Sequence, residues 1–84
     1  CHSGPLYTDG QIHDVGLASN RDAYRGYNTP SLVGLVRRVR YLHDGRARSL
    51  EELLTGPHNP AQVTGRGELT AEQRADLIEF LLTL

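Results

Sequence analysis

A shortage of large side chains is the feature that most limits how this chain can fold. The 84 residues include one Phe, four Tyr, no Trp and no Met. A chain of this length is too short to divide into two halves that each bury a core. So thin a core supplies little stability by itself, and the single cysteine allows no disulfide within the chain. We therefore expect one domain over residues 1–84 that is filled by something else, such as a large planar apolar group.

Three segments have the apolar spacing of helices. Pro30 suits a first helical turn, and the leucines and valines after it predict a helix of about ten residues. Ser49 and Glu52 form a capping box ahead of a second, short helix, and Thr70 and Gln73 form another ahead of the last helix. No stretch alternates apolar and polar residues for long enough to predict a strand. The sequence therefore predicts an all-α fold.

Long loops are expected to connect these helices. Residues 1–27 contain glycines without a sustained apolar period, which predicts a wrapping loop after a short helical turn. Glycines and prolines also interrupt residues 56–67, and a loop of that length is unusual in so small a domain. Such loops commonly carry function.

Charge and hydropathy exclude two classes of partner. The formal net charge is -1 and all nine basic residues are arginine, so no excess of positive charge indicates nucleic-acid binding. No apolar run reaches the roughly 18 residues of a membrane-spanning helix. We therefore expect no nucleic-acid partner and no membrane span.

Cys1 and His2 are the residues with the most specific chemistry. They match the last two positions of Cys-x-x-Cys-His, the motif that attaches c-type haem. In that motif two thiols form thioethers with the haem vinyl groups, and the histidine binds the iron. Because the chain does not begin with methionine, we expect it to be a piece of a longer protein whose preceding residues supply the other cysteine. An adjacent Cys and His is a weak signal alone, so the interpretation depends on the rest of the chain.

The rest of the chain contains several blocks in a fixed order. They read Cys-His-Ser-Gly-Pro-Leu-Tyr-Thr-Asp-Gly from Cys1, a histidine at position 13, Tyr-Asn-Thr-Pro-Ser-Leu from Tyr27, Tyr-Leu-His-Asp-Gly-Arg from Tyr41, Ser-Leu-Glu-Glu from Ser49, and Leu-Thr-x-x-Gln before the last helix. The ordered set resembles the C-terminal haem domain of the bacterial di-haem cytochrome c peroxidase and methylamine-utilisation (MauG-like) family. The resemblance covers essentially all 84 residues. It implies a cytochrome c-like domain with three to four short helices and long loops wrapped around a covalent haem c, although a piece without the first cysteine could fold without the haem.

The resemblance also implies what the domain does. Cys1 would supply one thioether, His2 would be the proximal iron ligand, and Pro5 and Pro30 would contact the haem. In this family the C-terminal haem usually takes electrons from a small donor protein, such as a cytochrome or cupredoxin, and passes them to a haem in the preceding domain. The expected parent is a bacterial periplasmic or otherwise extracytoplasmic oxidoreductase, in which this fragment relays electrons and is not itself catalytic.

The sixth iron ligand departs from the family pattern. Relatives have a methionine or tyrosine shortly after the Leu-Glu-Glu block, but this chain has no methionine and reads Thr-Gly-Pro-His-Asn-Pro from Thr55. His58 is the available donor, one residue later than the relatives' spacing would put it. The two interpretations are an iron held by two histidines and a surface loop histidine. A histidine ligand should give a lower reduction potential than methionine does.

Four further residues are candidates for the surroundings of the haem. His43 competes with His58 as a donor, but we favour a buried histidine held by hydrogen bonds. His13 is interpreted as structural or as a contact to a haem propionate. Arg46 or Arg48 could neutralise a propionate, or be an ordinary surface arginine.

Two other classes of function stay open at this point. The domain could host peroxide chemistry at an iron with an open sixth position. It could also be a haem-free structural or binding module, including a zinc site made of Cys1, His2 and another histidine. The spacing of those residues matches no common zinc site.

Overall fold

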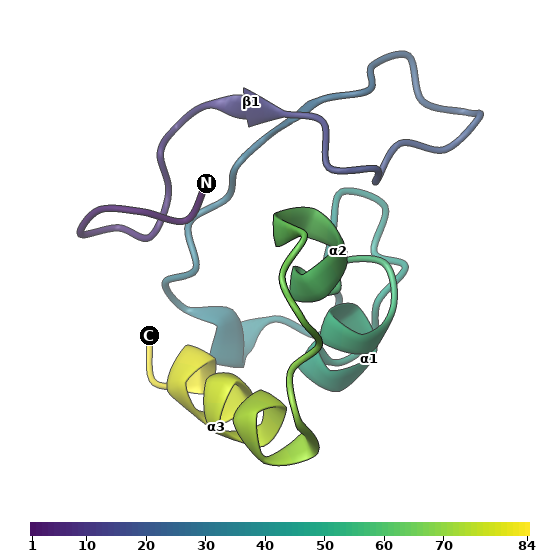
Figure 1. The fold of residues 1–84 in the computed structure, drawn as a ribbon. Helices are drawn as coiled ribbons and strands as arrows, with labels where there is room; N and C mark the ends of the chain where they lie inside the picture. The colour runs from purple at the N-terminus through teal and green to yellow at the C-terminus, as the bar shows by residue number, and fades with distance from the viewer. The chain divides into compact units, whose positions relative to one another are not determined.

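The computed structural model describes all of residues 1–84 (Figure 1). The chain divides into two compact units, Cys1–Val33 and Gly34–Leu84. The first contains two short strands, and the second contains the helices. None of the helices combines the length and the apolar character that crossing a membrane requires.

A small antiparallel sheet ties the first unit together. β1 (Ile12–His13) pairs with β2 (Tyr27–Asn28), so that His13 lies opposite Tyr27. Each strand has two residues, which is too short to show an alternating pattern in the sequence. The rest of the unit is loop and turn, as the sequence predicts.

Thr29 extends this pairing beyond the end of β2. Its backbone N–H and its hydroxyl both donate to the carbonyl of Gln11, at 2.9 and 3.1 Å. Thr29 is buried, and the Thr8 hydroxyl donates to its carbonyl at 2.6 Å. The first ten residues are therefore attached to the sheet by side-chain hydrogen bonds as well as by the chain itself.

A close approach explains the glycine just before β2. A Cβ atom at Gly26 would lie 2.8 Å from the Cγ2 atom of Ile12 and 3.4 Å from the carbonyl oxygen of His13. Side-chain atoms do not approach that closely without displacement, so a larger residue would push the two strands apart.

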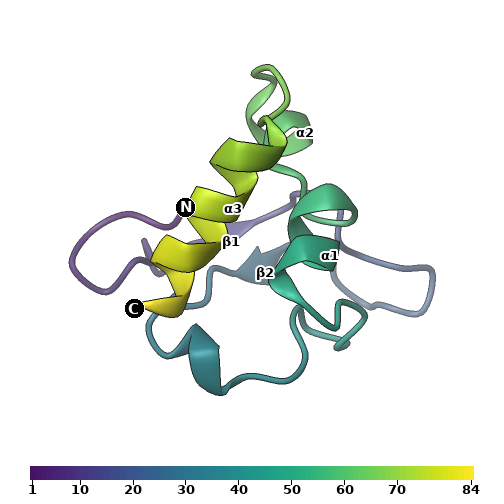
Figure 2. The ribbon, with the colours of Figure 1, turned by 90° about the horizontal axis from the view of Figure 1, so that it is seen from below.

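The second unit has a thin core between three helical segments. These are the 3-10 helix η1 (Leu35–Arg37), α1 (Leu50–Thr55) and α3 (Ala71–Leu82), and α3 packs against both of the others (Figure 2). The buried apolar residues of this unit are Leu35, Tyr41, Ala47, Leu50, Leu54 and Leu81. Only Ala47 among them is fully buried, as expected from the shortage of large side chains.

Both helices that the capping residues predicted are confirmed. Thr70 accepts from the backbone of Gln73, whose side chain accepts from the backbone of Thr70, so both arms of this capping box are present. Ser49 accepts from the backbone N–H of Glu52 at 3.0 Å. The Glu52 carboxylate accepts from the backbone of Arg48 at 3.2 Å, one residue before the expected partner.

The ten-residue helix predicted from Pro30 is wrong, because only η1 forms in that region. Gly34 precedes η1 with a φ of 83°, and a left-handed residue cannot continue a right-handed helix. Val36 and Val39 are 62% and 83% exposed, so the apolar spacing does not mark a buried face.

A helix also forms inside the loop predicted over residues 56–67. This helix, α2 (Pro60–Thr64), starts at the Asn59 side chain, which accepts from the backbone of Ala61 at 3.0 Å. Proline is favoured at a first helical position, and Gly65 ends the helix with a φ of 71°. The sequence therefore contained both end signals of a helix that is only five residues long.

The cytochrome c-like arrangement stays a prediction.

Candidate functional site

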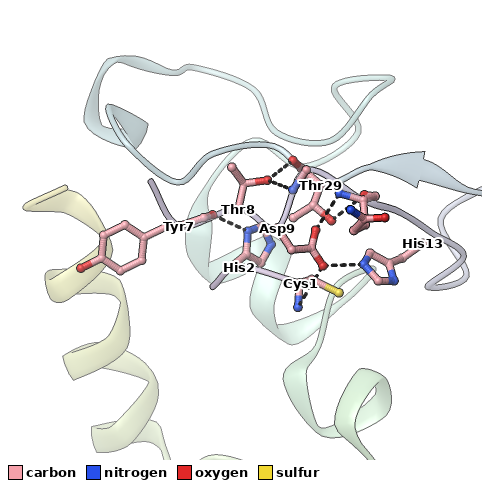
Figure 3. A network of polar contacts seen from close by, with 9 residues as sticks. Cys1, His2, Tyr7, Thr8, Asp9, His13 and Thr29 are labelled. Carbon is pink, nitrogen blue, oxygen red and sulfur yellow. Dashed lines mark hydrogen bonds and ion pairs between the residues drawn. The ribbon is translucent and has the colours of Figure 1, made fainter. Parts of the chain in front are cut away.

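Cys1 and His2 begin a loop that closes at Asp9. The Asp9 backbone N–H donates to the carbonyl of Cys1 at 2.7 Å, and a turn between them is closed by a bond from the Tyr7 N–H to the Gly4 carbonyl at 3.1 Å. Figure 3 shows Cys1, His2 and Asp9 gathered in one polar network. The local hydrogen bonds thus fold the motif back on itself.

The ring of His2 is oriented by this loop. Its Nδ1 lies 3.2 Å from the carbonyl oxygen of Tyr7. Because a carbonyl only accepts, Nδ1 must be the protonated nitrogen, and the lone pair that could bind a metal is then on Nε2. His2 is half-buried, and the adjacent Cys1 is exposed with a free thiol.

Asp9 is held by its carboxylate as well as by its backbone. One oxygen accepts from the Gln11 N–H at 2.9 Å, and the other lies 2.7 Å from Nε2 of His13. The Gln11 N–H, and after it the His13 ring, lower the pKa of the Asp9 carboxyl to about 2. His13 is therefore paired with Asp9 in the structure, and its contact to a haem propionate stays a prediction.

Asp9 should make the stability of the chain depend on pH. Its folded-state pKa of about 2 lies below the ordinary 3.8, so the ionised form is favoured by folding. That contribution is complete above the unfolded-state pKa and is lost as the pH falls toward about 2. We expect Asp9→Asn to lower the melting temperature at about pH 6 and to have little effect near the folded-state pKa. Thermal unfolding followed by circular dichroism measures this, and a difference that stays constant with pH would contradict it.

Cys1, Asp9 and His13 also form a possible metal-binding group. The Cys1 Sγ, an Asp9 carboxylate oxygen and a His13 ring nitrogen lie within 4.8 Å of one another. Sulfur, nitrogen and oxygen donors of these types all bind zinc. The sequence suggested a zinc site made of Cys1, His2 and another histidine. In the structure the group contains Asp9 in place of His2. A thioether at Cys1 would use the same sulfur, so zinc and haem c are alternatives here.

His58 lies just after α1 in the second unit. Its backbone N–H donates to the carbonyl of Leu53 at 3.0 Å, which closes the turn that follows the helix. The residue is half-buried, and its ring Nδ1 atom is buried. The ring is therefore turned into the protein, unlike a fully solvated loop histidine.

The other predicted site residues are exposed. Pro5 and Pro30 lie in the first unit, with Cys1, His2 and His13, while His43 and Arg46 belong to the second, with His58.

His43 does not have the burial that we favoured for it. Arg46 forms an ion pair with Asp44, 2.7 Å between Nη2 and Oδ2, and its hydrogen bonds lower the pKa of the Asp44 carboxyl. Its guanidinium is thus already engaged by a neighbouring carboxylate.

Comparison with curated proteins confirms the resemblance, and the chain is a relative of the MauG-like family along its whole length. Methylamine utilization protein MauG of Methylorubrum extorquens is 34% identical to this chain over an alignment that is 104 residues long. The alignment covers 100% of this chain and 30% of that protein. The protein of the same name from Methylophilus methylotrophus is 29% identical over 106 residues, with 100% and 31% covered. The chain therefore spans about 30% of the length of the curated relatives it matches. No family model and no solved structure matches it.

Proposed function

We propose that the chain is a haem c electron-transfer domain of a di-haem cytochrome c peroxidase-like protein. The observation that carries the proposal is the alignment of the whole chain with MauG proteins, beginning at the Cys1-His2 pair. The chain spans about 30% of the length of the Methylorubrum extorquens protein. The activity and the partners of the whole protein are therefore part of this proposal. The proposed partners are a preceding haem domain and a small electron-donor protein, and the proposed location is the bacterial periplasm.

The residues of the first unit fit a c-type haem. The Cys1 thiol is exposed and able to form a thioether, and His2 follows it directly. The Nδ1 bond from His2 to the Tyr7 carbonyl is the kind of contact that fixes the tautomer of metal-bound histidines and raises their basicity. A bound haem supplies a one-electron couple between Fe(III) and Fe(II).

We propose that His58 would be the second residue that holds the haem iron, together with His2. Its half-buried ring and the absence of methionine from the chain support this role. The bond from the His58 N–H to Leu53 fixes the backbone of the turn and limits where the ring can lie. An iron held by both His2 and His58 would leave no open position for peroxide, which favours electron transfer over peroxide chemistry in this domain.

Adding hydrogen peroxide to the haem-loaded ferric protein tests this function against the peroxidatic alternative. With both axial positions held by histidine, the absorption spectrum of this haem should not change on the timescale of mixing. A small reductant should nevertheless reduce it fully, because electron transfer needs no open position. A rapid peroxide-dependent change would instead support an open site that carries out peroxide chemistry.

Zinc binding at Cys1, Asp9 and His13 is the second candidate function, because their donor atoms lie within 4.8 Å of one another. Cobalt(II) is a suitable probe, since a bound thiolate gives a charge-transfer band. If zinc binding is the function, this band should appear in the unmodified protein and disappear in Cys1→Ser. Absence of the band in the unmodified protein would exclude this candidate.

A further inference from the structure

Asp9 makes hydrogen bonds both with its backbone and with its carboxylate. Its N–H donates to the Cys1 carbonyl at 2.7 Å, and its carboxylate accepts from Gln11 at 2.9 Å and pairs with His13 at 2.7 Å (Figure 3). Its side chain is 23% exposed. Asp9 therefore joins the residue before His2 to the strand β1.

The loop that Asp9 closes holds Tyr7 in an unfavourable conformation. Tyr7 has a φ of 55°, a region that residues with a bulky side chain rarely adopt. Such a conformation persists only when the surrounding structure holds it, and it is a reason to look for a function. Here the carbonyl of this residue is the partner of His2 Nδ1.

Hydrogen bonds on both sides hold the Tyr7 carbonyl in place. Before it, the Tyr7 N–H donates to Gly4 at 3.1 Å. After it, the Thr8 hydroxyl donates to Thr29 at 2.6 Å, and Asp9 makes the contacts described above. Asp9 bonds to the Cys1 end of the loop through its backbone N–H and to the sheet through the His13 ring.

We propose that Asp9 is a positioning residue that keeps the Tyr7 carbonyl against Nδ1 of His2. This inference depends on the proposed function, in which Nε2 of His2 binds haem iron. A histidine whose Nδ1–H is hydrogen-bonded donates more strongly to a metal through Nε2. Asp9 thus acts on the iron through the loop, without touching the haem or the ligand itself.

The test compares Asp9→Ala with Asp14→Ala in the haem-loaded protein. Asp14 is an exposed carboxylate of the same unit whose oxygen accepts from the Gly16 N–H at 3.1 Å, so both variants lose one negative charge. The iron–histidine stretching band of the ferrous protein, in a His58→Ala background with one axial histidine, reports on the His2 bond. We expect Asp9→Ala to lower this frequency and to raise the reduction potential more than Asp14→Ala does. Asp9→Asn keeps the shape and one acceptor oxygen, so it should shift both quantities less.

Three results would overturn the proposal in distinguishable ways. Haem-loaded Asp9→Ala with the same stretching band and potential as Asp14→Ala overturns the positioning role and leaves the proposed function intact. If Asp9→Ala does not fold, Asp9→Asn takes its place, and an unshifted band in that variant has the same meaning. If the protein takes up no haem even when a Cys-x-x segment completes the motif in front of Cys1, the proposed function is overturned, and the positioning role with it.

Discussion

Replacing His58 with alanine should convert the ferric haem from low-spin to high-spin. Two histidine ligands give iron a strong ligand field, and removing one leaves a vacant or water-bound position. The half-buried ring and the buried Nδ1 of His58 are the structural basis for this expectation. The change is measured by electron paramagnetic resonance and by the position of the Soret band.

His43→Ala is the matched control for this experiment. His43 competed with His58 as a donor in the sequence, lies in the same unit and is exposed. Its replacement should leave the low-spin spectrum unchanged. A high-spin spectrum in the unmodified protein would contradict the assignment of His58, and loss of the low-spin form in His43→Ala would transfer the assignment to that residue.

Leu81→Ala should have the largest effect on stability among the variants considered. Leu81 lies on α3 and is 7% exposed, in a unit whose core has few large side chains. Removing a buried leucine side chain costs about 2–5 kcal/mol through lost transfer free energy and the cavity left behind. Urea unfolding followed by circular dichroism measures the loss.

The neighbouring residue gives a control with the same chemical change. Leu82 is 41% exposed, so Leu82→Ala removes less buried surface and should cost roughly 1 kcal/mol or less. Equal losses of unfolding free energy in the two variants would mean that Leu81 is no more buried than Leu82, which would contradict the structure.

The elements that could be predicted from the sequence are those fixed by short-range chemistry. Thr70 and Gln73 satisfy the first backbone groups of α3 through their own side chains, and Ser49 does so for α1. Such contacts involve residues three apart, so the sequence contains all the information. The helix α2 was missed although Asn59 and Gly65 carry the same kind of signal, because a helix this short gives no apolar period.

Apolar spacing was misleading where a backbone break overrode it. Leu35, Val36 and Val39 fit a helical period, but the left-handed conformation of Gly34 breaks the helical backbone directly before them. Nothing in the spacing distinguishes an exposed valine from a buried one, and burial depends on contacts with distant residues. The period alone was therefore insufficient evidence for a helix here.

The candidate site was predictable as a set of residue types and not as a set of contacts. The order of the sequence blocks identifies Cys1 and His2, which are neighbours in any fold. The carbonyl that orients His2 and the role of Asp9 depend on a loop that runs from Cys1 and closes at Asp9. The Asp9-Gly10 pair indicates a turn, but no sequence rule pairs its carboxylate with His13.

The most direct test of the account is whether haem is covalently bound at Cys1. The protein, carrying a Cys-x-x segment in front of Cys1 that completes the attachment motif, is isolated from cells that attach haem c. It is extracted with acidified acetone and examined by its pyridine haemochrome spectrum and by mass spectrometry. We predict that one haem stays with the polypeptide after extraction and that a peptide containing Cys1 carries it. Haem that passes entirely into the solvent, or a Cys1 peptide of unmodified mass, would contradict the account.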